Sequence, residues 1–186
     1  MILGLQRGTV KLEPHSPQWE TAAQDIIIKL KDILENDIVD AQHIGSTAIK
    51  CTSAKPIIDI VAGVESFDRI FKYNDILSAN GIIYRRQDHP NQHLYICGDL
   101  KNNIHTHYIH VVLWGGKEWT DYINMRDYLN AHKEKAIEYS NIKKYLAEKY
   151  PDDRTAYTNG KSDFITEILH SAAEWRKASE AIKKSE

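Results

Sequence analysis

The sequence predicts an α+β fold, in which a mixed, mostly antiparallel sheet is flanked by helices and followed by a helical C-terminal part. Three observations support this prediction. Helical and strand-like patterns alternate up to about residue 113, strand signals disappear from Lys117 onward, and apolar residues then recur at helical spacing. We therefore expect a single domain over residues 1–186, with a sheet-containing core at about 15–115 and a helical portion at about 117–176.

The first predicted helix begins near Trp19. Its apolar residues recur every three or four positions: Trp19, Ala22, Ala23, Ile26, Ile27, Leu30, Ile33 and Leu34. A short stretch, Val39–Ile44, then ends at a turn formed by Gly45-Ser46. The next strand is predicted at Pro56–Val64. Pro56 should mark its beginning or its edge, because proline lacks the N–H group that a central strand donates.

Three further strands are predicted in the middle of the chain. Helical turns at about Phe67–Leu77 precede them and stop at Asn80-Gly81. The strands are expected at Ile82–Arg86, Leu94–Cys97 and Tyr108–Leu113. Together with the earlier strands, they indicate a mixed and mostly antiparallel sheet.

Successive helices are predicted after Lys117. Apolar residues at helical spacing mark one helix around Tyr122–Leu129 and another around Ala136–Leu146, which Pro151 should end. A last helix carries an apolar face at Phe164–Ala172. The remaining residues, Lys177–Glu186, are predicted to form a solvated tail.

The composition restricts the classes of partner. The net charge is −2, so the chain has no basic excess of the kind that binds nucleic-acid backbones, and a small anionic ligand fits better. The two cysteines, Cys51 and Cys97, indicate neither a disulfide framework nor a thiolate zinc site. No apolar run is long enough to span a bilayer, and no membrane partner is expected. We expect a cytoplasmic protein.

The most informative stretch is His43-Ile44-Gly45-Ser46-Thr47, followed by Lys55-Pro56-Ile57-Ile58-Asp59-Ile60. Glycine permits close approach of a backbone to a phosphate, and hydroxyl groups and amides bind its oxygens. A carboxylate on the following strand, Asp59, would hold Mg²⁺ against the same phosphates. The alternative is structural: Gly45, Ser46 and Thr47 would cap the next helix, and Asp59 would form an ion pair or cap a turn.

This spacing resembles the nucleotidyltransferase core, where Gly-Ser is followed about a dozen residues later by an acidic-x-acidic strand. Here the second acidic position is Val61. Two-metal catalysis would normally use a carboxylate at that position. Glu65, Asp88 and Asp99 are the acidic residues considered as replacements in space, and no spacing rule selects one of them.

Over about Trp19–Ala173 the chain resembles the GrpB family. The matching blocks, in order, are His-Ile-Gly-Ser-Thr, Lys-Pro-Ile-Ile-Asp-Ile, Thr-His-Tyr-Ile-His-Val-Val, Arg-Asp-Tyr-Leu and Tyr-Thr-Asn-Gly-Lys-Ser-Asp-Phe-Ile. The resemblance implies a nucleotidyltransferase-like fold. Because a similar domain is joined to dephospho-CoA kinase in some proteins, it also points to nucleotide or coenzyme metabolism.

Histidines form a second group of candidates. If the strand is regular, His105 and His107 share one face, whereas His110 lies on the other face beside Tyr108. The resemblance carries over His110, because the family strand ends in His-x-His-Val, and it places Tyr108 where the family has its first histidine. His110 could act as a general acid or base, a phosphate donor or a metal ligand. The alternative is a sheet histidine satisfied by hydrogen bonds.

Cationic residues supply candidate phosphate contacts. Lys55 could reach a phosphate, or it could be an ordinary exposed lysine at a strand entrance. Arg126 lies on a helix outside the apolar face, so it is predicted either to contact an anion or to form an ion pair with Asp127, Glu134 or a neighbouring strand.

The second cationic group follows in the C-terminal part. Arg154, Tyr157 and Lys161 fall near one face of a continuous helix, where two cations and a ring could hold phosphate and base. If the chain turns at Asn159-Gly160, we expect these three residues not to lie together and the cations to form a solvated face.

Two functions follow from these candidates. In the first, the protein is a metal-dependent nucleotidyltransferase-like enzyme that binds a nucleoside triphosphate and Mg²⁺ and transfers a nucleotidyl group to an unknown acceptor. Asp59 and His110 would be its catalytic residues. In the second, the same cleft is a non-catalytic module that binds a nucleotide or another phosphorylated small molecule.

Overall fold

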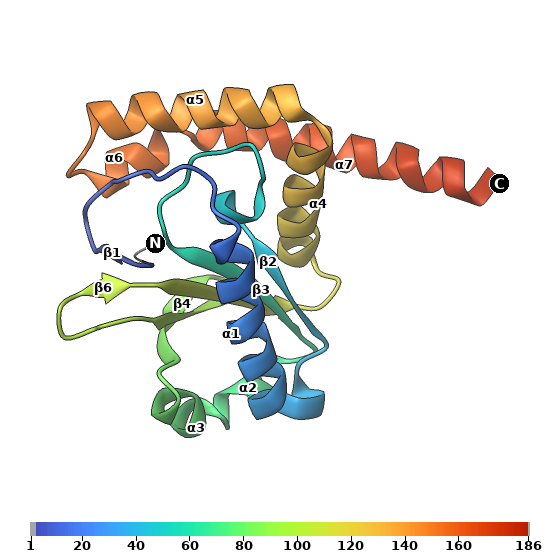
Figure 1. Cartoon of the computed structure of the whole chain (residues 1–186). Helices are drawn as coiled ribbons and strands as arrows, with labels where there is room; N and C mark the ends of the chain where they lie inside the picture. Colours follow the sequence, from blue (N-terminus) through green and yellow to red (C-terminus); the bar gives the residue numbers. More distant parts are fainter. Residues whose placement is uncertain (1–2, 186) are drawn as a thin grey trace.

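A five-stranded mixed sheet forms the centre of the molecule. The computed structural model describes residues 3–185, so residues 1, 2 and 186 of the predicted domain lie outside the described residues. The strand order is β2 (Asp40–Ile44), β3 (Ile58–Val64), β7 (His107–Leu113), β5 (Gln92–Cys97) and β4 (Ile83–His89). The pair β3 and β7 is parallel and the other three pairs are antiparallel. The predicted mixed, mostly antiparallel sheet is confirmed (Figure 1).

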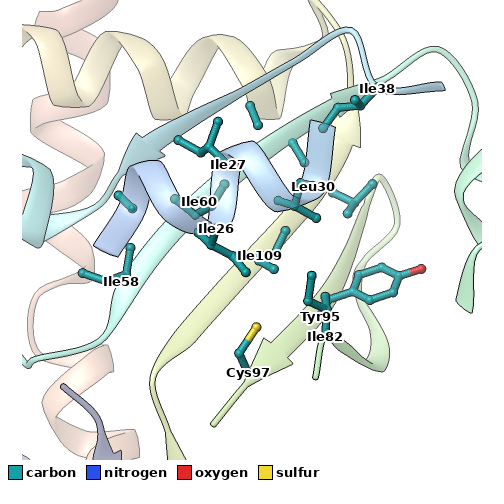
Figure 2. Packing of buried hydrophobic residues seen from close by; sticks show 14 of the residues in the cluster. Ile26, Ile27, Leu30, Ile38, Ile58, Ile60, Ile82, Tyr95, Cys97 and Ile109 are labelled. Atoms are coloured by element: carbon teal, nitrogen blue, oxygen red, sulfur yellow. The ribbon is translucent and has the colours of Figure 1, made fainter. Parts of the chain in front are cut away.

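Helix α1 (Gln18–Leu34) covers one face of this sheet. Most of its apolar stripe is buried, with Trp19 and Leu34 at 0% exposure, and Ala22 and Ile33 are partly buried at its edges. Ile58 and Ile60 of β3 and Ile109 of β7 point toward the helix and complete the largest core cluster (Figure 2). Burial of such side chains stabilises a fold by about 1.5–3 kcal/mol each, so this contact accounts for the predicted helix.

Alternation along β3 gives the sheet a second, different face. Because successive side chains of a strand point to opposite sides, Asp59 and Val61 face away from α1. Val61 packs there with Ile44, Val112 and Trp119. The carboxylate therefore lies outside the main apolar core.

Small elements complete the N-terminal part. Helices α2 (Phe67–Phe71) and α3 (Asn74–Ala79) occupy the predicted helical turns, and single 3-10 turns form at η1 (Glu35–Asp37) and η2 (Ser46–Ala48). A two-stranded sheet pairs β1 (Leu5–Gln6) with β6 (Ile104–His105). The N-terminal segment before residue 15 also packs on the helical C-terminal part, since Val10 is only 7% exposed and shares an apolar cluster with Leu146 and Tyr157.

Four helices follow the sheet: α4 (Lys117–Ala131), α5 (Lys133–Lys149), α6 (Arg154–Asn159) and α7 (Ser162–Ser185). Tyr139 of α5 and Ile168 of α7 share a second apolar cluster. Figure 1 shows α5, α6 and α7 gathered at one end of the sheet. Helix α7 continues to Ser185, so the predicted tail from Lys177 is helical within the described residues. Glu180, Ala181 and Ile182 are exposed there, in agreement with the prediction of a solvated segment.

None of the helices in the described part of the chain combines the length and the apolar character that crossing a membrane requires.

Candidate functional site

A glycine turn places the backbone of β2 directly against the carboxylate of Asp59. Ile44, the last residue of β2, pairs with Asp59. Gly45 follows with φ +69°, and a Cβ atom at this position would lie 2.6 Å from Asp59 Oδ2. Both the positive φ and the close contact require glycine. The turn and the carboxylate therefore form one unit, as the motif predicted.

The residues after Gly45 form a short 3-10 turn and no long helix. Ser46 Oγ donates to the hydroxyl of Tyr139 at 3.3 Å, and Thr47 Oγ1 lies 2.8 Å from His43 Nε2. Burial lowers the pKa of His43 to about 4, and Arg126 also lowers it, although the nearby Asp59 carboxylate acts in the opposite direction. His43 is therefore neutral near pH 7 and serves as a fixed partner of Thr47.

Asp59 opens into a cavity of about 230 Å³, which we name the Asp59 pocket. Its lining comes from the turn after β2, from β3, β4, β5 and β7, and from the α6–α7 region: Ser46, Thr47, Lys55, Ile57, Asp59, Arg86, Asp88, Leu94, Tyr108, His110, Arg154, Tyr157 and Lys161. The structure thus brings together the candidates that the sequence scattered over more than a hundred positions. Arg126 is not among them.

Three cations and two rings form one wall of this pocket. The ammonium groups of Lys55 and Lys161 lie 5.3 and 5.1 Å from the centre of the Tyr157 ring. Arg154 donates to the Tyr108 hydroxyl at 2.8 Å, and its guanidinium lies over the Tyr108 ring. The chain does turn at Gly160, so the expectation that a turn would dissolve this group was wrong: the turn itself brings Lys161 back over Tyr157.

Near pH 7, Lys55 is present in both its charged and its neutral form. Burial, together with the positive charges of Arg154 and Lys161, lowers its pKa to about 7, and the carboxylate of Asp59 acts in the opposite direction. Lys55 is thus no ordinary exposed lysine. An anion entering the pocket would favour its charged form.

Sequence reasoning missed Lys143 of α5, which lies behind the pocket. The residue is 1% exposed, and its Nζ atom donates a hydrogen bond to the carbonyl of Ser53 at 2.6 Å. Burial lowers its pKa to about 6, helped by Lys161 and Lys55. The sequence contains one indication that this lysine is buried. Lys143 follows Tyr139 by four positions and precedes Leu146 by three, so it lies on the apolar face of its helix.

Asp59 and His110 face each other in the pocket. His110 Nε2 lies 3.4 Å from Asp59 Oδ1, and the other ring nitrogen of His110 is buried without a hydrogen-bond partner in the described residues. Asp59 forms no other ion pair among residues 3–185. Its side chain is 30% exposed, so a ligand can reach it.

The other histidines do not follow the predicted alternation. The strand is interrupted at Thr106, between β6 and β7, and His105 Nδ1 therefore reaches the Tyr108 hydroxyl at 3.0 Å. His107 packs on the opposite side, where it contacts the backbone of Ala22 in α1. The expectation that His105 and His107 share one face was wrong.

The position of the missing carboxylate is closed to solvent, because Val61 is 0% exposed beneath Trp119. Of the three acidic residues that might replace it in space, Asp88 lines the pocket and pairs with Arg86 at 2.9 Å. Glu65 instead pairs with Arg69. Asp99 binds Asn102 in a loop.

Mg²⁺ commonly takes one or two protein carboxylates and completes its coordination with waters and substrate phosphates. Within residues 3–185, no group of three or more His, Cys, Asp or Glu side chains is placed to hold a metal by itself. Asp59 therefore fits a shared site, in which phosphate oxygens supply further ligands, and does not fit a closed site made of protein alone.

Arg126 holds strand β2 and helix α4 together. Its guanidinium donates to Gln42 Oε1 at 2.7 Å and to the His43 carbonyl at 3.1 Å, and it pairs with Asp127. The structure thus does not bring Arg126 to the Asp59 pocket. Its contacts match the structural alternative.

Comparison with known proteins decides the family. The family model described as GrpB protein matches residues 9–171. The chain belongs to the GrpB family. It is 41% identical over 172 residues to the glutamate-rich protein GrpB of Alkalihalophilus pseudofirmus, with 91% of this chain and 99% of that protein covered. The crystal structure of GrpB from Enterococcus faecalis is similar, with a TM-score of 0.83 at 26% identity over 89% of this chain and 99% of that chain.

The fold extends beyond GrpB proteins. A cytoplasmic RNA terminal U-transferase has a TM-score of 0.51 at 10% identity, covering 74% of this chain and 41% of that chain. At this identity the likeness concerns the fold, which is nucleotidyltransferase-like with a helical C-terminal part. The predicted fold class is confirmed.

Proposed function

We propose that this GrpB protein binds the phosphate groups of a nucleoside triphosphate, or of another phosphorylated small molecule, in the Asp59 pocket. The observation that carries this proposal is the convergence of Lys55, Arg154 and Lys161 from separate parts of the chain. Like charges gathered in a partly buried cavity repel each other, and a polyphosphate would relieve that repulsion through charge-assisted hydrogen bonds. Ser46 adds a hydroxyl at the edge of the pocket.

Thermal unfolding in the presence of a panel of nucleotides tests this function. A ligand that binds only the folded state stabilises it by about 2.7 kcal/mol at a hundred times its dissociation constant. We expect a rise in Tm with a triphosphate, reduced in Lys161→Gln and in Arg154→Gln. Lys144→Gln is the matched control, because Lys144 is an exposed lysine of α5 outside the pocket. No rise in Tm with any phosphorylated ligand would contradict the proposal.

A second candidate function is nucleotidyl transfer, and the pairing of Asp59 with His110 inside the same pocket favours it. An acceptor hydroxyl would attack the α-phosphorus, the bond to the bridging oxygen would break, and diphosphate would leave. In this proposal His110 would take the hydroxyl proton. Asp59 would hold Mg²⁺ together with phosphate oxygens, and the ion, when bound, neutralises negative charge on the phosphates.

Diphosphate release in the presence of Mg²⁺ separates transfer from binding alone. For an enzyme, Asp59→Asn should remove both the Mg²⁺ dependence of binding and the release of diphosphate. His110→Gln should remove release and retain binding. A rise in Tm that is indifferent to Mg²⁺, with no diphosphate released, would instead identify a non-catalytic binding module.

A further inference from the structure

A second cavity, of about 220 Å³, adjoins the Asp59 pocket. We name it the arginine cavity, after its lining of Arg7, Arg85, Arg86, Leu94, Ile96, His105, Tyr108 and Arg154. Arg86, Leu94, Tyr108 and Arg154 line both cavities. The two cavities therefore share a wall, and one ligand molecule can contact both.

An irregularity in β4 directs two neighbouring arginines into this cavity. In a regular strand, Arg85 and Arg86 would point to opposite faces. Here the pairing of β4 with β5 shifts between Tyr84 and Arg86, so that Arg85 has no partner in the ladder. Bulges of this kind re-aim side chains and are frequent beside functional sites. Both guanidinium groups consequently line the same cavity.

The N-terminal segment supplies the third arginine. Pairing of β1 with β6 sets Leu5 opposite His105, and the amide of Arg7 then donates to the carbonyl of Asn103 at 2.9 Å. Arg7 is thus held beside residues that follow it by about a hundred positions. Deletion of this pairing would remove the arginine from the cavity.

Two of the arginines that line the arginine cavity, Arg7 and Arg85, are exposed and have no partner of opposite charge among the described residues. The lining of the cavity contains no carboxylate. Arg86 pairs with Asp88, but the side chains of Arg7 and Arg85 form no hydrogen bond or ion pair with any described residue. Burial is the main cause that lowers the pKa of His105, and the positive charges of Arg154, Arg7 and Arg85 lower it as well. All three arginines are therefore close enough to His105 to act on its charge.

We propose that the arginine cavity binds a second phosphoryl group of the ligand whose first phosphate occupies the Asp59 pocket. The ligand would therefore carry phosphoryl groups at two separate positions, as a nucleoside 3′,5′-bisphosphate does. This inference rests on the proposed function of the Asp59 pocket. Planar guanidinium groups bind phosphate oxygens in a bidentate manner, and the shared wall formed by Arg86 and Arg154 places both groups within one ligand.

Calorimetric titration with adenosine 5′-monophosphate and adenosine 3′,5′-bisphosphate tests the inference. We expect the bisphosphate to bind about tenfold more tightly than the monophosphate. This ratio of dissociation constants corresponds to roughly one additional charge-assisted hydrogen bond. In the double variant Arg7→Gln/Arg85→Gln, this preference should be lost while the affinity for the monophosphate is unchanged. The variant leaves Arg86 and Arg154 in place, since both line the Asp59 pocket as well.

A second double variant, Lys29→Gln/Lys144→Gln, removes two exposed positive charges that line neither cavity and should retain the preference. Equal affinities of the wild-type protein for the two nucleotides would overturn the inference, as would a preference that survives in Arg7→Gln/Arg85→Gln. If an excess of inorganic phosphate strengthens monophosphate binding instead, the second group belongs to a separate molecule and the inference is wrong. Absence of binding by both nucleotides would also overturn the inference, whereas the proposed function is contradicted only if no phosphorylated ligand in the thermal panel raises Tm.

Discussion

At the scale of single residues, the contact between Gly45 and Asp59 couples the stability of the turn to the position of the carboxylate. Gly45→Ala should lower the free energy of unfolding by about 1–2 kcal/mol through backbone strain at positive φ, with a further loss from the clash with Asp59. It should also weaken triphosphate binding, because the carboxylate must move. Urea unfolding and calorimetric titration measure the two effects.

Gly81→Ala is the matched control for this prediction. Gly81 has a similar φ of +79°, but no atom lies within 4 Å of a Cβ placed there. Its substitution should therefore cost the strain alone and leave ligand binding unchanged. Equal effects of the two substitutions on binding would show that Gly45 has no special relation to the site.

A second residue-scale prediction concerns the proton of Lys55. Its pKa is about 7 in the folded protein, compared with 10.5 for an ordinary lysine. A phosphate ligand raises this pKa toward the ordinary value, so at about pH 8 binding should take up a proton and affinity should fall as pH rises. Titration in two buffers with different heats of ionisation should give different apparent enthalpies. The difference should vanish in Lys55→Gln; a wild-type enthalpy that is the same in both buffers would contradict the prediction.

At the scale of elements, α5 holds the segment between β2 and β3 through a buried lysine. The pKa of Lys143 is about 6 when folded and 10.5 for an ordinary lysine, so between these values the unfolded state binds the additional proton. Stability should consequently rise with pH across this range, by up to about 1.4 kcal/mol per pH unit from one such group. Lys143→Met should flatten the dependence, as measured by urea unfolding at several pH values.

Lys144→Met provides the comparison on the same helix, because Lys144 is exposed. Its pH dependence should match that of the wild-type protein. If Lys143→Met and Lys144→Met give the same slope, the lowered pKa of Lys143 is not what governs stability in this range.

Local patterns in the sequence were sufficient to predict most of the helices and strands. The apolar spacing of α1 and the β-branched run of β3 each reflect burial of one face, which the sequence records directly. Turn geometry was not predictable in this way. Whether Lys161 returns to Tyr157 after Gly160 depends on the conformation of the turn and on packing against α5, and neither leaves a periodic pattern.

At the scale of the whole molecule, the net charge is −2, although positive side chains are concentrated around the Asp59 pocket and the arginine cavity. Binding of a triphosphate should weaken as sodium chloride is raised, because salt screens charges separated by more than about 8 Å at physiological ionic strength. Arg154→Gln should bind less tightly at low salt and show a shallower salt dependence. Affinity that is independent of salt in the wild-type protein would exclude this electrostatic contribution.

The sequence predicted most residues that line the Asp59 pocket, but it did not predict Arg7 and Arg85, which line the arginine cavity alone. The Gly45-Ser46 turn and Asp59 lie close in sequence, so a spacing rule found them. Arg7 and Arg85 belong to the N-terminal strand and to the bulge in β4, and they meet only because β1 pairs with β6. The net charge of the chain does not reveal a local group of arginines. A bulge also interrupts the two-residue alternation of side chains from which strand faces are predicted.

Strand β4 is the outer strand of the five-stranded sheet, and an outer strand presents unpaired backbone groups to other molecules. Its bulges and its exposed Arg85 and Arg86 make it a poor template for pairing with a second copy of the chain. The same irregularity that opens the arginine cavity thus protects the protein from edge-to-edge aggregation. Apolar substitutions at Arg85 and Arg86 should reduce solubility, even in a protein that never meets its ligand.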